Sequence, residues 1–380
     1  MNKMTPQIRF QGFTDDWEER KFADFIDVKS GKDYKHLNSG SIPVYGTGGY
    51  MLSVDRALSD IDAIGIGRKG TIDKPYLLKA PFWTVDTLFY AVPKQNIDLQ
   101  FSLSIFKKIN WKKFDESTGV PSLSKTVINS VGASVPSYEE QQKIGSFFQQ
   151  LDKAIALHQR MLDLLKEQKK GFLQKMFPKN GAKVPELRFS GFDDDWEERK
   201  LKELGDIQTG NTPPTSDSDN YSLDGVLWVT PTDIKSLVIS NTAKKLSRVG
   251  VTKARIAKAG SILVTSIASI GKNTLLRMDA GFNQQINSLT PTSENDSYFL
   301  LTQSEKWSEK MKQTAASATM QIVNKTDFSN ISTYVPVHKE EQEKIGSFFK
   351  QLDDIIALHQ RKLDLLKEQK KGFLQKMFVS

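Results

Sequence analysis

The 380-residue sequence has no cysteine and only four histidines. Without thiols the chain forms no disulfide, no thiolate metal site and no cysteine nucleophile, a composition that fits a reducing compartment. The histidines are His36, His158, His338 and His359, and no cluster of carboxylates accompanies them in the sequence. We therefore expect neither hydrolysis nor strand cleavage by this chain alone.

Long apolar runs are also missing. Ser261–Ile267 is typical of the runs present, and it is far shorter than the roughly 20 residues that span a bilayer. Because no signal peptide is recognisable either, we expect a cytoplasmic protein without a membrane partner. Hydrophobic residues make up 38% and charged residues 26% of the chain, the balance of a folded protein with two or three domains.

No motif for nucleotide binding or base modification is complete. Thr212-Pro213-Pro214-Thr215 has the prolines of an Asn-Pro-Pro-Tyr tetrad but lacks its amide and its aromatic residue. Gly46-Thr47-Gly48-Gly49 has neither dinucleotide nor P-loop spacing and is interpreted as a turn. Ser269–Asn273 lacks the upstream glycine and the final hydroxyl residue of a Walker motif. We expect no cofactor and no metal in this chain.

Positive charge is in excess, because 53 Lys and Arg face 45 Asp and Glu, which gives a net charge of +8 and a pI near 9.2. Such a balance favours a polyanionic partner, although a basic protein without one remains possible. Each cation alone is more typical of a solvated face than of a phosphate contact. The most clustered are Arg68-Lys69, Lys107-Lys108, Lys112-Lys113, Lys244-Lys245, Arg248, Lys253, Arg255, Lys258 and Lys272.

A 39-residue stretch occurs twice. Glu139–Phe177 returns as Glu340–Phe378 with 34 of 39 residues identical. From Ile144 to Met176 a seam recurs at alternating steps of four and three residues, which predicts a helix of roughly 58 Å. Two such helices in one chain most simply pack seam to seam. The residues expected to pair the helices or to dock other subunits are Ile144, Phe147, Phe148, Leu151, Ile155, His158, Leu162, Leu165 and Phe172 in the first copy, and Ile345, Phe348, Phe349, Leu352, Ile356, His359, Leu363, Leu366 and Phe373 in the second.

His158 and His359 occupy the same seam position of the two copies. Such a pair is compatible with a metal site or a pH switch. A polar layer that fixes helix register is the favoured interpretation, because no carboxylate or cysteine cluster accompanies the pair.

The repeat extends beyond the helix. The leading segments, Pro6–Gly31 and Pro185–Gly210, agree at 14 of 26 positions, and Lys125-Thr126 before the first helix matches Lys325-Thr326 before the second. Between these matching parts lie divergent inserts, 31–136 and 210–336. Each half is therefore a leading segment, an insert and a long helix, and we expect the C-terminus to lie near the first leading segment.

Both inserts have mixed α/β patterning. Expected strands are 41–45, 63–67 and 82–92 in the first insert, and 226–230, 261–267 and 285–289 in the second. One helix is expected in each, over 98–114 and 297–314.

Glycines, which let the backbone approach a ligand, combine with hydroxyls and cations in a few loops of the inserts, and amides and hydroxyls in the second insert suit contacts with base edges. For each amide, an ordinary turn hydrogen bond is an equally good explanation. The candidate DNA-binding residues are Tyr45, Thr47, Gly48, Tyr50, Arg68, Lys69, Thr71, Thr118, Ser122 and Lys125 in the first insert, and Thr230, Ser266, Ser269, Lys272, Gln284, Gln285, Asn287, Thr319, Gln321 and Lys325 in the second.

With two divergent inserts, each closed by a near-identical helix, the sequence resembles the specificity subunits of type I restriction-modification systems. Ile42–Gly46, Ile66–Gly70, Phe82–Leu88, Trp228–Ile234 and Gln284–Asn287 add to this resemblance, which covers essentially the whole chain. It implies a non-catalytic subunit whose two target-recognition domains each bind half of a bipartite duplex DNA site. It also implies two methylation subunits and, in the full complex, restriction subunits, which would supply the chemistry of S-adenosylmethionine, ATP and Mg.

The expected fold is α+β, with two mixed α/β target-recognition domains separated by two long helices that pack as an antiparallel coiled coil. The expected boundaries are 1–138 for the first leading segment and recognition domain, 139–177 for the first helix, 178–339 for the second leading segment and domain, and 340–380 for the second helix. Two alternatives remain: a methyltransferase or nuclease that acts alone through an unrecognised motif, and a coiled-coil scaffold without a DNA role.

Overall fold

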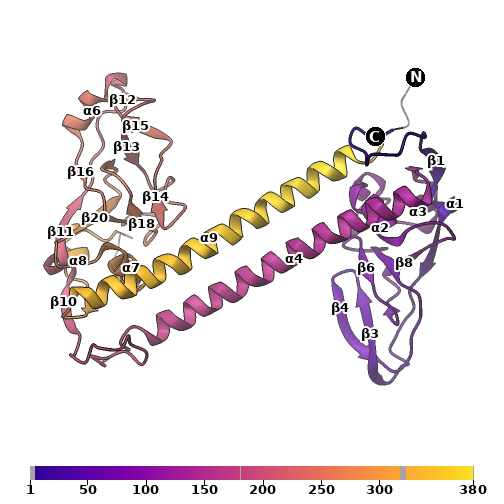
Figure 1. Cartoon of the computed structure of the whole chain (residues 1–380), viewed down its shortest axis with the longest axis horizontal. Helices are drawn as coiled ribbons and strands as arrows, with labels where there is room; N and C mark the ends of the chain where they lie inside the picture. Colours follow the sequence, from indigo (N-terminus) through magenta and orange to yellow (C-terminus); the bar gives the residue numbers. More distant parts are fainter. Residues whose placement is uncertain (1–4, 180, 317–321, 380) are drawn as a thin grey trace. The chain divides into compact units, whose positions relative to one another are not determined.

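The computed structural model describes residues 5–179, 181–316 and 322–379. Its contacts divide the chain into two compact units, Met1–Met161 with His359–Ser380, and Leu162–Leu358. Two long helices, α4 (Tyr138–Lys175) and α9 (Lys339–Lys376), contribute to both units and are unbroken along their length (Figure 1). Each unit contains one mixed α/β domain and the parts of both helices that pack on it.

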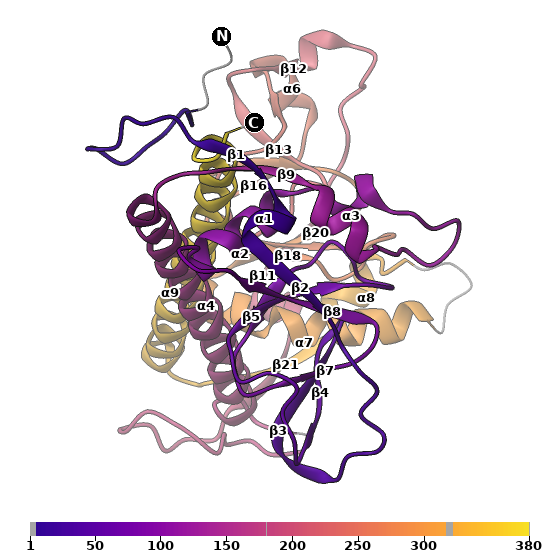
Figure 2. The same ribbon diagram turned by 90° about the vertical axis from the view of Figure 1, so that its right-hand side faces the viewer.

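The first unit is built on an antiparallel sheet in the order β2 (Ile26–Ser30), β8 (Leu88–Pro93), β5 (Ala63–Gly67) and β6 (Tyr76–Leu78). All five residues of β5 are buried, as its inner position in the sheet requires. A second sheet joins β4 (Gly49–Val54), β3 (Ser39–Gly46) and β7 (Trp83–Thr84). In both views β3 and β4 extend as a hairpin from the rest of this domain (Figures 1 and 2).

The second unit repeats that plan with additions. Its first sheet has the order β11 (Gly205–Thr209), β20 (Ile286–Pro291), β17 (Ile262–Thr265), β18 (Asn273–Leu276) and β14 (Val238–Ile239). The first four strands therefore correspond to β2, β8, β5 and β6. Its second sheet has the order β12 (Tyr221–Ser222), β15 (Lys244–Leu246), β13 (Val226–Val229), β19 (Ala280–Phe282) and β16 (Ile256–Ala257).

Short helices complete both units. The first contains α1 (Phe22–Phe25), α2 (Leu99–Lys108), the 3₁₀ helix η1 (Trp111–Phe114) and α3 (Lys125–Ser130). The second contains α5 (Leu201–Leu204), the 3₁₀ helix η2 (Ser218–Asn220), α6 (Arg248–Lys253), α7 (Ser297–Ala316) and α8 (Lys325–Ser329).

The leading segments are held in the same way in the two units. Strand β1 (Glu18–Lys21) pairs with β9 (Gly132–Val135), and β10 (Glu197–Lys200) pairs with β21 (Ser332–Val335) in the same register. The backbone N–H of Ile8 donates to the carbonyl of Lys376 at 3.0 Å, as that of Leu187 does to Lys175 at 2.8 Å. The end of α9 therefore contacts the first leading segment, as the repeat predicted.

Within each unit the beginning of one long helix packs against the end of the other, so the helices run antiparallel. Phe147 and Phe373 meet edge to face at 5.0 Å in the first unit, and Phe172 and Phe348 do so at 5.0 Å in the second. All the predicted pairing residues are buried or half-buried. Between His158 and His359 the Nδ1 atoms lie 3.1 Å apart. Among the described residues no group of three or more His, Asp or Glu could hold a metal ion at this pair or elsewhere.

Two expected elements in the first insert are wrong, because each is divided into two in the structure. The strand expected over 82–92 is two strands, because β7 pairs with β3 in one sheet and β8 with β2 and β5 in the other. The helix expected over 98–114 ends at Lys108 with Ile109 extended, and η1 follows. This turn buries Trp111 completely, and its Nε1–H donates to the carbonyl of Phe106 at 2.8 Å.

No helix in the described part of the chain has the length and apolar character that crossing a membrane requires.

Candidate nucleic-acid interface

In the first unit the end of β5 brings together three loops that lie far apart in the sequence. The carbonyl of Arg68 accepts from the N–H of Leu123 at 2.9 Å, and Lys69 bridges to Ser122. Gly70, which has a φ of +89°, turns the chain beyond them. A Cβ placed on Gly70 would lie 3.7 Å from Thr47 Oγ1 at the tip of the β3–β4 hairpin. The loops 45–50, 66–71 and 117–122 thus meet at one edge of the domain.

This edge carries a cavity of about 360 Å³ lined by Ser30, Arg68, Lys69, Phe89, Glu116, Ser122, Leu123, Ser124 and Lys125. The guanidinium of Arg68 lies over the ring of Phe89 at 5.9 Å, which holds a cation at the cavity wall. Lys69 and Lys125 are exposed there. Glu116 adds one carboxylate, but its Oε2 accepts from the N–H of Ser124 at 3.1 Å. Three cations at one concave edge form a suitable environment for a phosphate backbone.

The remaining candidates of the first insert lie around this edge. Tyr50 is 63% exposed beside the hairpin turn, and Tyr45 is half-buried against Tyr76 with their ring centroids 6.2 Å apart. Gly48 and Thr118 are exposed, and Thr71 is half-buried.

Asp115 is a residue of this edge that the sequence reasoning missed. Its Oδ1 accepts from the backbone N–H groups of Ser122 and Ser117 and from the Ser117 hydroxyl. These hydrogen bonds lower the pKa of Asp115 below its ordinary value, so the group is ionised at neutral pH. An aspartate two residues before a serine is a common Asx-turn pattern and could have identified it.

The second unit builds the corresponding edge at the end of β17. The carbonyl of Ser266 accepts from the N–H of Val323 at 3.0 Å, as Arg68 does from Leu123, and Ile267 bridges to Ile322. Ala268 has a φ of +61° at the position where the first unit has Gly70. An alanine in this left-handed conformation costs of order 1 kcal/mol. Such strained residues are found in functional loops more often than in loops that only connect elements.

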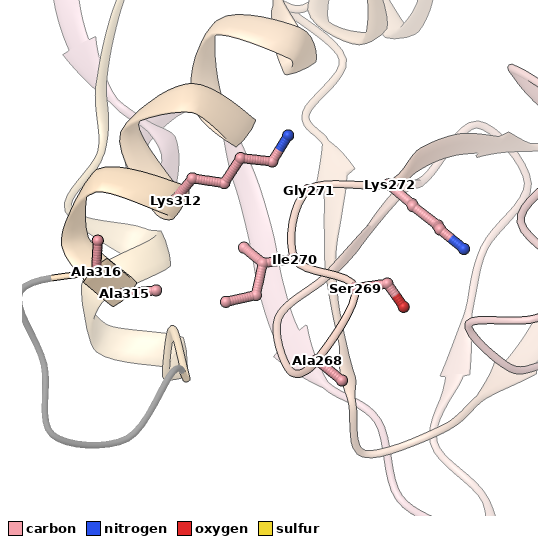
Figure 3. Close-up of a pocket in the computed structure, with 8 residues that line it drawn as sticks. All are labelled: Ala268, Ser269, Ile270, Gly271, Lys272, Lys312, Ala315 and Ala316. Atoms are coloured by element: carbon pink, nitrogen blue, oxygen red, sulfur yellow. The ribbon is translucent and has the colours of Figure 1, made fainter.

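The loop beyond Ala268 has two faces. Ile270 points toward α7, whereas Ser269 and Lys272 point away from it (Figure 3). A cavity of about 470 Å³ lies between the loop and α7, lined by Ala268, Ser269, Ile270, Gly271, Lys272, Lys312, Ala315 and Ala316. A Cβ on Gly271 would approach Ser308 Cβ to 2.6 Å, so the loop packs closely on the helix. The polar side chains are therefore presented on its outer face.

Three candidates of the second insert form hydrogen bonds with other groups of the domain. Asn287 is 1% exposed, accepts from the Thr209 hydroxyl at 2.6 Å and donates to the carbonyl of Val323 at 3.2 Å. The Ser266 hydroxyl is buried and donates to the Gln285 carbonyl at 3.1 Å. The hydroxyl of Thr230 donates to Asp233 Oδ2 at 2.6 Å in the turn after β13. These groups brace the edge.

Gln284 is exposed and accepts from the Thr212 hydroxyl, and Gln285 is half-buried beside it. Lys325 is exposed at the start of α8, as Lys125 is at the start of α3. Thr319 and Gln321 lie outside the described residues.

Several basic residues away from these edges are paired. Lys112 contacts Asp73 at 2.9 Å, Lys253 contacts Asp217 at 3.1 Å, and Lys258 contacts Asp279 at 2.9 Å. Such exposed pairs contribute little to stability, but they reduce the local excess of positive charge. Net charge alone therefore does not locate the interface.

Comparison with known proteins identifies the same repeat. The family model described as Type I restriction modification DNA specificity domain matches residues 14–167 and again 193–368. The MjaVIII specificity subunit of Methanocaldococcus jannaschii is 22% identical over 335 residues, which cover 83% of this chain and 75% of that protein. The HindI specificity subunit of Haemophilus influenzae is 31% identical over 163 residues, 40% of this chain and 35% of that protein.

The fold is also similar to a solved structure. The S subunit of a type I restriction-modification system from M. genitalium superposes with a TM-score of 0.77 at 14% identity, over 99% of this chain and 100% of the other. At this identity the match shows a shared fold. Together with the two family matches, it confirms the resemblance inferred from the duplicated helix and the divergent inserts.

Proposed function

The chain belongs to the type I restriction modification DNA specificity domain family, and we propose that it is the DNA-recognition subunit of such a system, with each recognition domain binding one half of a bipartite duplex site. The observation that carries this proposal is the second match to the specificity domain within one chain. Two copies share a frame but differ at the loops that meet beside β5 and β17. A shared frame suits a common partner, and different loops suit two different half-sites.

The chemistry of the two edges supports different half-sites. In the first unit Arg68, Lys69 and Lys125 surround a cavity, whereas the corresponding loop of the second unit presents Ser269 and Lys272. Cations position a protein on phosphates, and side chains and loop shape discriminate base edges. Of the predicted residues that the structure describes, the proposal assigns Asn287, Ser266 and Thr230 to bracing and retains the others as DNA contacts.

The long helices fit the roles of spacer and docking surface. Leu157 is 64% exposed and Leu358 is 58% exposed at the same position of the repeat, and Leu164 and Leu365 are 52% and 50% exposed. Exposed leucines at repeated positions suit two copies of one partner. We assign that partner as the methylation subunit, with restriction subunits in the full complex. S-adenosylmethionine, ATP and Mg would act in those subunits.

The proposal is tested by expressing the chain with its methylation subunits and mapping the modified bases across the host genome. Two short motifs at a fixed gap are expected. Lys69→Glu should weaken modification, and any loss of sequence specificity should be confined to the half-site bound by the first domain. Lys272→Glu should affect the other half-site. A single continuous motif would refute the bipartite assignment.

Two measurements separate the alternatives. Saturable binding of S-adenosylmethionine to the isolated chain in calorimetry would favour a methyltransferase that acts alone. For a DNA-binding subunit, the affinity for duplex must fall steeply with added salt because bound phosphates release counterions. Duplex binding that is absent at low salt would favour a scaffold without a DNA role.

A further inference from the structure

The segment 115–124 of the first unit, between η1 and α3, is a loop held by hydrogen bonds at both ends, and we call it the braced loop. Asp115 Oδ1 accepts from the N–H of Ser117 at 3.0 Å, from the Ser117 hydroxyl at 2.8 Å and from the N–H of Ser122 at 2.9 Å. The N–H of Glu116 donates to the Ser122 carbonyl at 3.1 Å. One carboxylate thus ties the two sides of the loop together.

The braced loop is also fixed to the domain. The N–H of Gly70 donates to the Pro121 carbonyl at 2.8 Å, and the N–H of Leu123 donates to the Arg68 carbonyl at 2.9 Å. Leu123 is 3% exposed and belongs to the main core of the unit. The sheet therefore fixes the position of the loop tip. Because the tip is already ordered, little conformational entropy is lost when a ligand binds.

The tip of the loop is exposed and chemically distinctive. Thr118, Gly119 and Val120 are all exposed, and Val120 reaches 66%. Nothing lies within 4 Å of a Cβ placed on Gly119. The tip carries no amide side chain and no charge, and beside the Thr118 hydroxyl it presents the apolar side chain of Val120, which suits an apolar contact with a base edge. In the major groove the apolar group on a base edge is the C5 methyl of thymine.

Cations lie on the flank of the same loop. Ser122, Ser124 and Glu116 share the lining of the 360 Å³ cavity with Arg68, Lys69 and Lys125. A phosphate backbone held by those cations would place the adjacent base edges within reach of the tip. Charged groups would then position the duplex, and the uncharged tip would discriminate a base.

We propose that Val120 recognises the C5 methyl of a thymine in the half-site bound by the first domain, and that Asp115 acts as its positioning residue. This inference rests on the proposed function, because it requires the first domain to bind duplex DNA. It adds a named contact, a base identity and a residue that holds the loop in place.

The test uses the complex with its methylation subunits and a duplex carrying the mapped bipartite site. Each thymine of the first half-site is replaced in turn by deoxyuridine, which removes only the methyl group. At one position the wild-type complex should lose about fourfold in affinity, the magnitude of one buried methyl group. Val120→Ala should bind the thymine and uracil duplexes equally, and Asp115→Ala, which removes the acceptor that ties the loop together, should reduce the same discrimination.

Val249→Ala is the matched control, because Val249 is 47% exposed in the other unit. This variant should keep the full preference for thymine over uracil in the first half-site. If Val120→Ala also keeps it, if the wild-type complex shows no preference, or if the first half-site contains no A·T pair, the inference is wrong while the proposed function stands. Failure to obtain any bipartite site would instead remove both.

Discussion

Arg9 and Glu140 form the ion pair at which the first leading segment meets the start of α4. Arg9 Nε and Nη2 donate to the two carboxylate oxygens at 2.7 and 2.8 Å, and Glu140 is fully buried. The hydrogen bonds from Arg9 to Glu140 raise the pKa of the guanidinium, so Arg9 stays charged. Arg188 and Glu341 repeat this geometry in the second unit at the same two distances.

Arg9→Met is expected to lower the free energy of unfolding of the first unit by about 3 kcal/mol, because it leaves a buried carboxylate without its partner. Urea unfolding followed by tryptophan fluorescence measures this change. Arg188→Met should destabilise the second unit by a similar amount. Lys79→Met removes a pair whose lysine side chain is 65% exposed, and this control should change stability by less than about 1 kcal/mol. Equal effects of Arg9→Met and Lys79→Met would contradict the assignment.

Asp152 joins both long helices to the first recognition domain. It accepts from Lys370 of α9 and, at 2.9 Å, from Lys107 of α2. Burial alone would raise the pKa of Asp152, but the hydrogen bonds from Lys370 and Lys107 together outweigh burial and lower it. The folded state therefore prefers the ionised carboxylate.

This preference predicts a loss of stability in acid. The contribution of Asp152 is complete above the unfolded pKa of about 4 and disappears as the pH falls through the lower folded value. The urea midpoint of the wild type should exceed that of Asp152→Asn at pH 7, and the difference should shrink between pH 4 and pH 2. Asp354→Asn, at an exposed position of α9, is the control and should change the midpoint little at any pH. A wild-type advantage that stays constant down to pH 2 would exclude this role.

At the scale of elements, α4 and α9 show which features the sequence can predict. Their helical character and their pairing residues follow from a periodicity that is visible within a few turns. Strand β7 could not be separated from β8 in the same way, because the break depends on β3, which pairs with β7 from a distant part of the chain. Local pattern predicts an element, and partner strands decide its limits.

In the candidate interface, too, the sequence predicts local features but not the long-range contacts between them. The three loops of the first insert were recognisable from glycines, hydroxyls and cations. Their meeting at the end of β5 depends on the bridge between Lys69 and Ser122, which is a long-range contact. Likewise, the sequence around Asn287 does not show whether its side chain faces DNA or, as in this structure, donates to the carbonyl of Val323. Burial separates these roles, and burial is a property of the fold.

If the helices act as the spacer between half-sites, their length should set the gap. Seven additional residues inserted after Gln159 and after Gln360 preserve the seam and lengthen each helix by about 10 Å. The gap should grow by about three base pairs, at roughly 3.4 Å per pair, while both half-site sequences stay the same. Modified-base mapping of the variant complex measures the gap.

The matched control is a seven-residue insertion after Lys179, which lies outside both helices. It should leave the gap unchanged. Modification at the original spacing by the protein with both helices extended would refute the spacer role.

At the scale of the whole molecule, the chain uses the same junction twice, once through a covalent connection and once without it. Leu187 follows Lys175 by twelve residues and donates a backbone hydrogen bond to it. Ile8 donates the corresponding bond to Lys376, although the two lie at opposite ends of the sequence. If Ser380 were joined directly to Met1, Ile8 would also follow Lys376 by twelve residues.

This equality predicts that a circular permutant will fold and function. The variant that begins at Gly181, continues from Ser380 directly to Met1 and ends at Asn180 should keep the two half-sites and the gap, because the bonds from Ile8 to Lys376 and from Leu187 to Lys175 can both still form. Its thermal midpoint should lie within a few degrees of the wild-type value, since only a surface connection changes. A permutant opened between Gln159 and Arg160 is the control, because the cut interrupts α4, and it should lose DNA recognition. Loss of recognition in the first permutant as well would show that the covalent link after α4 does more than join equivalent halves.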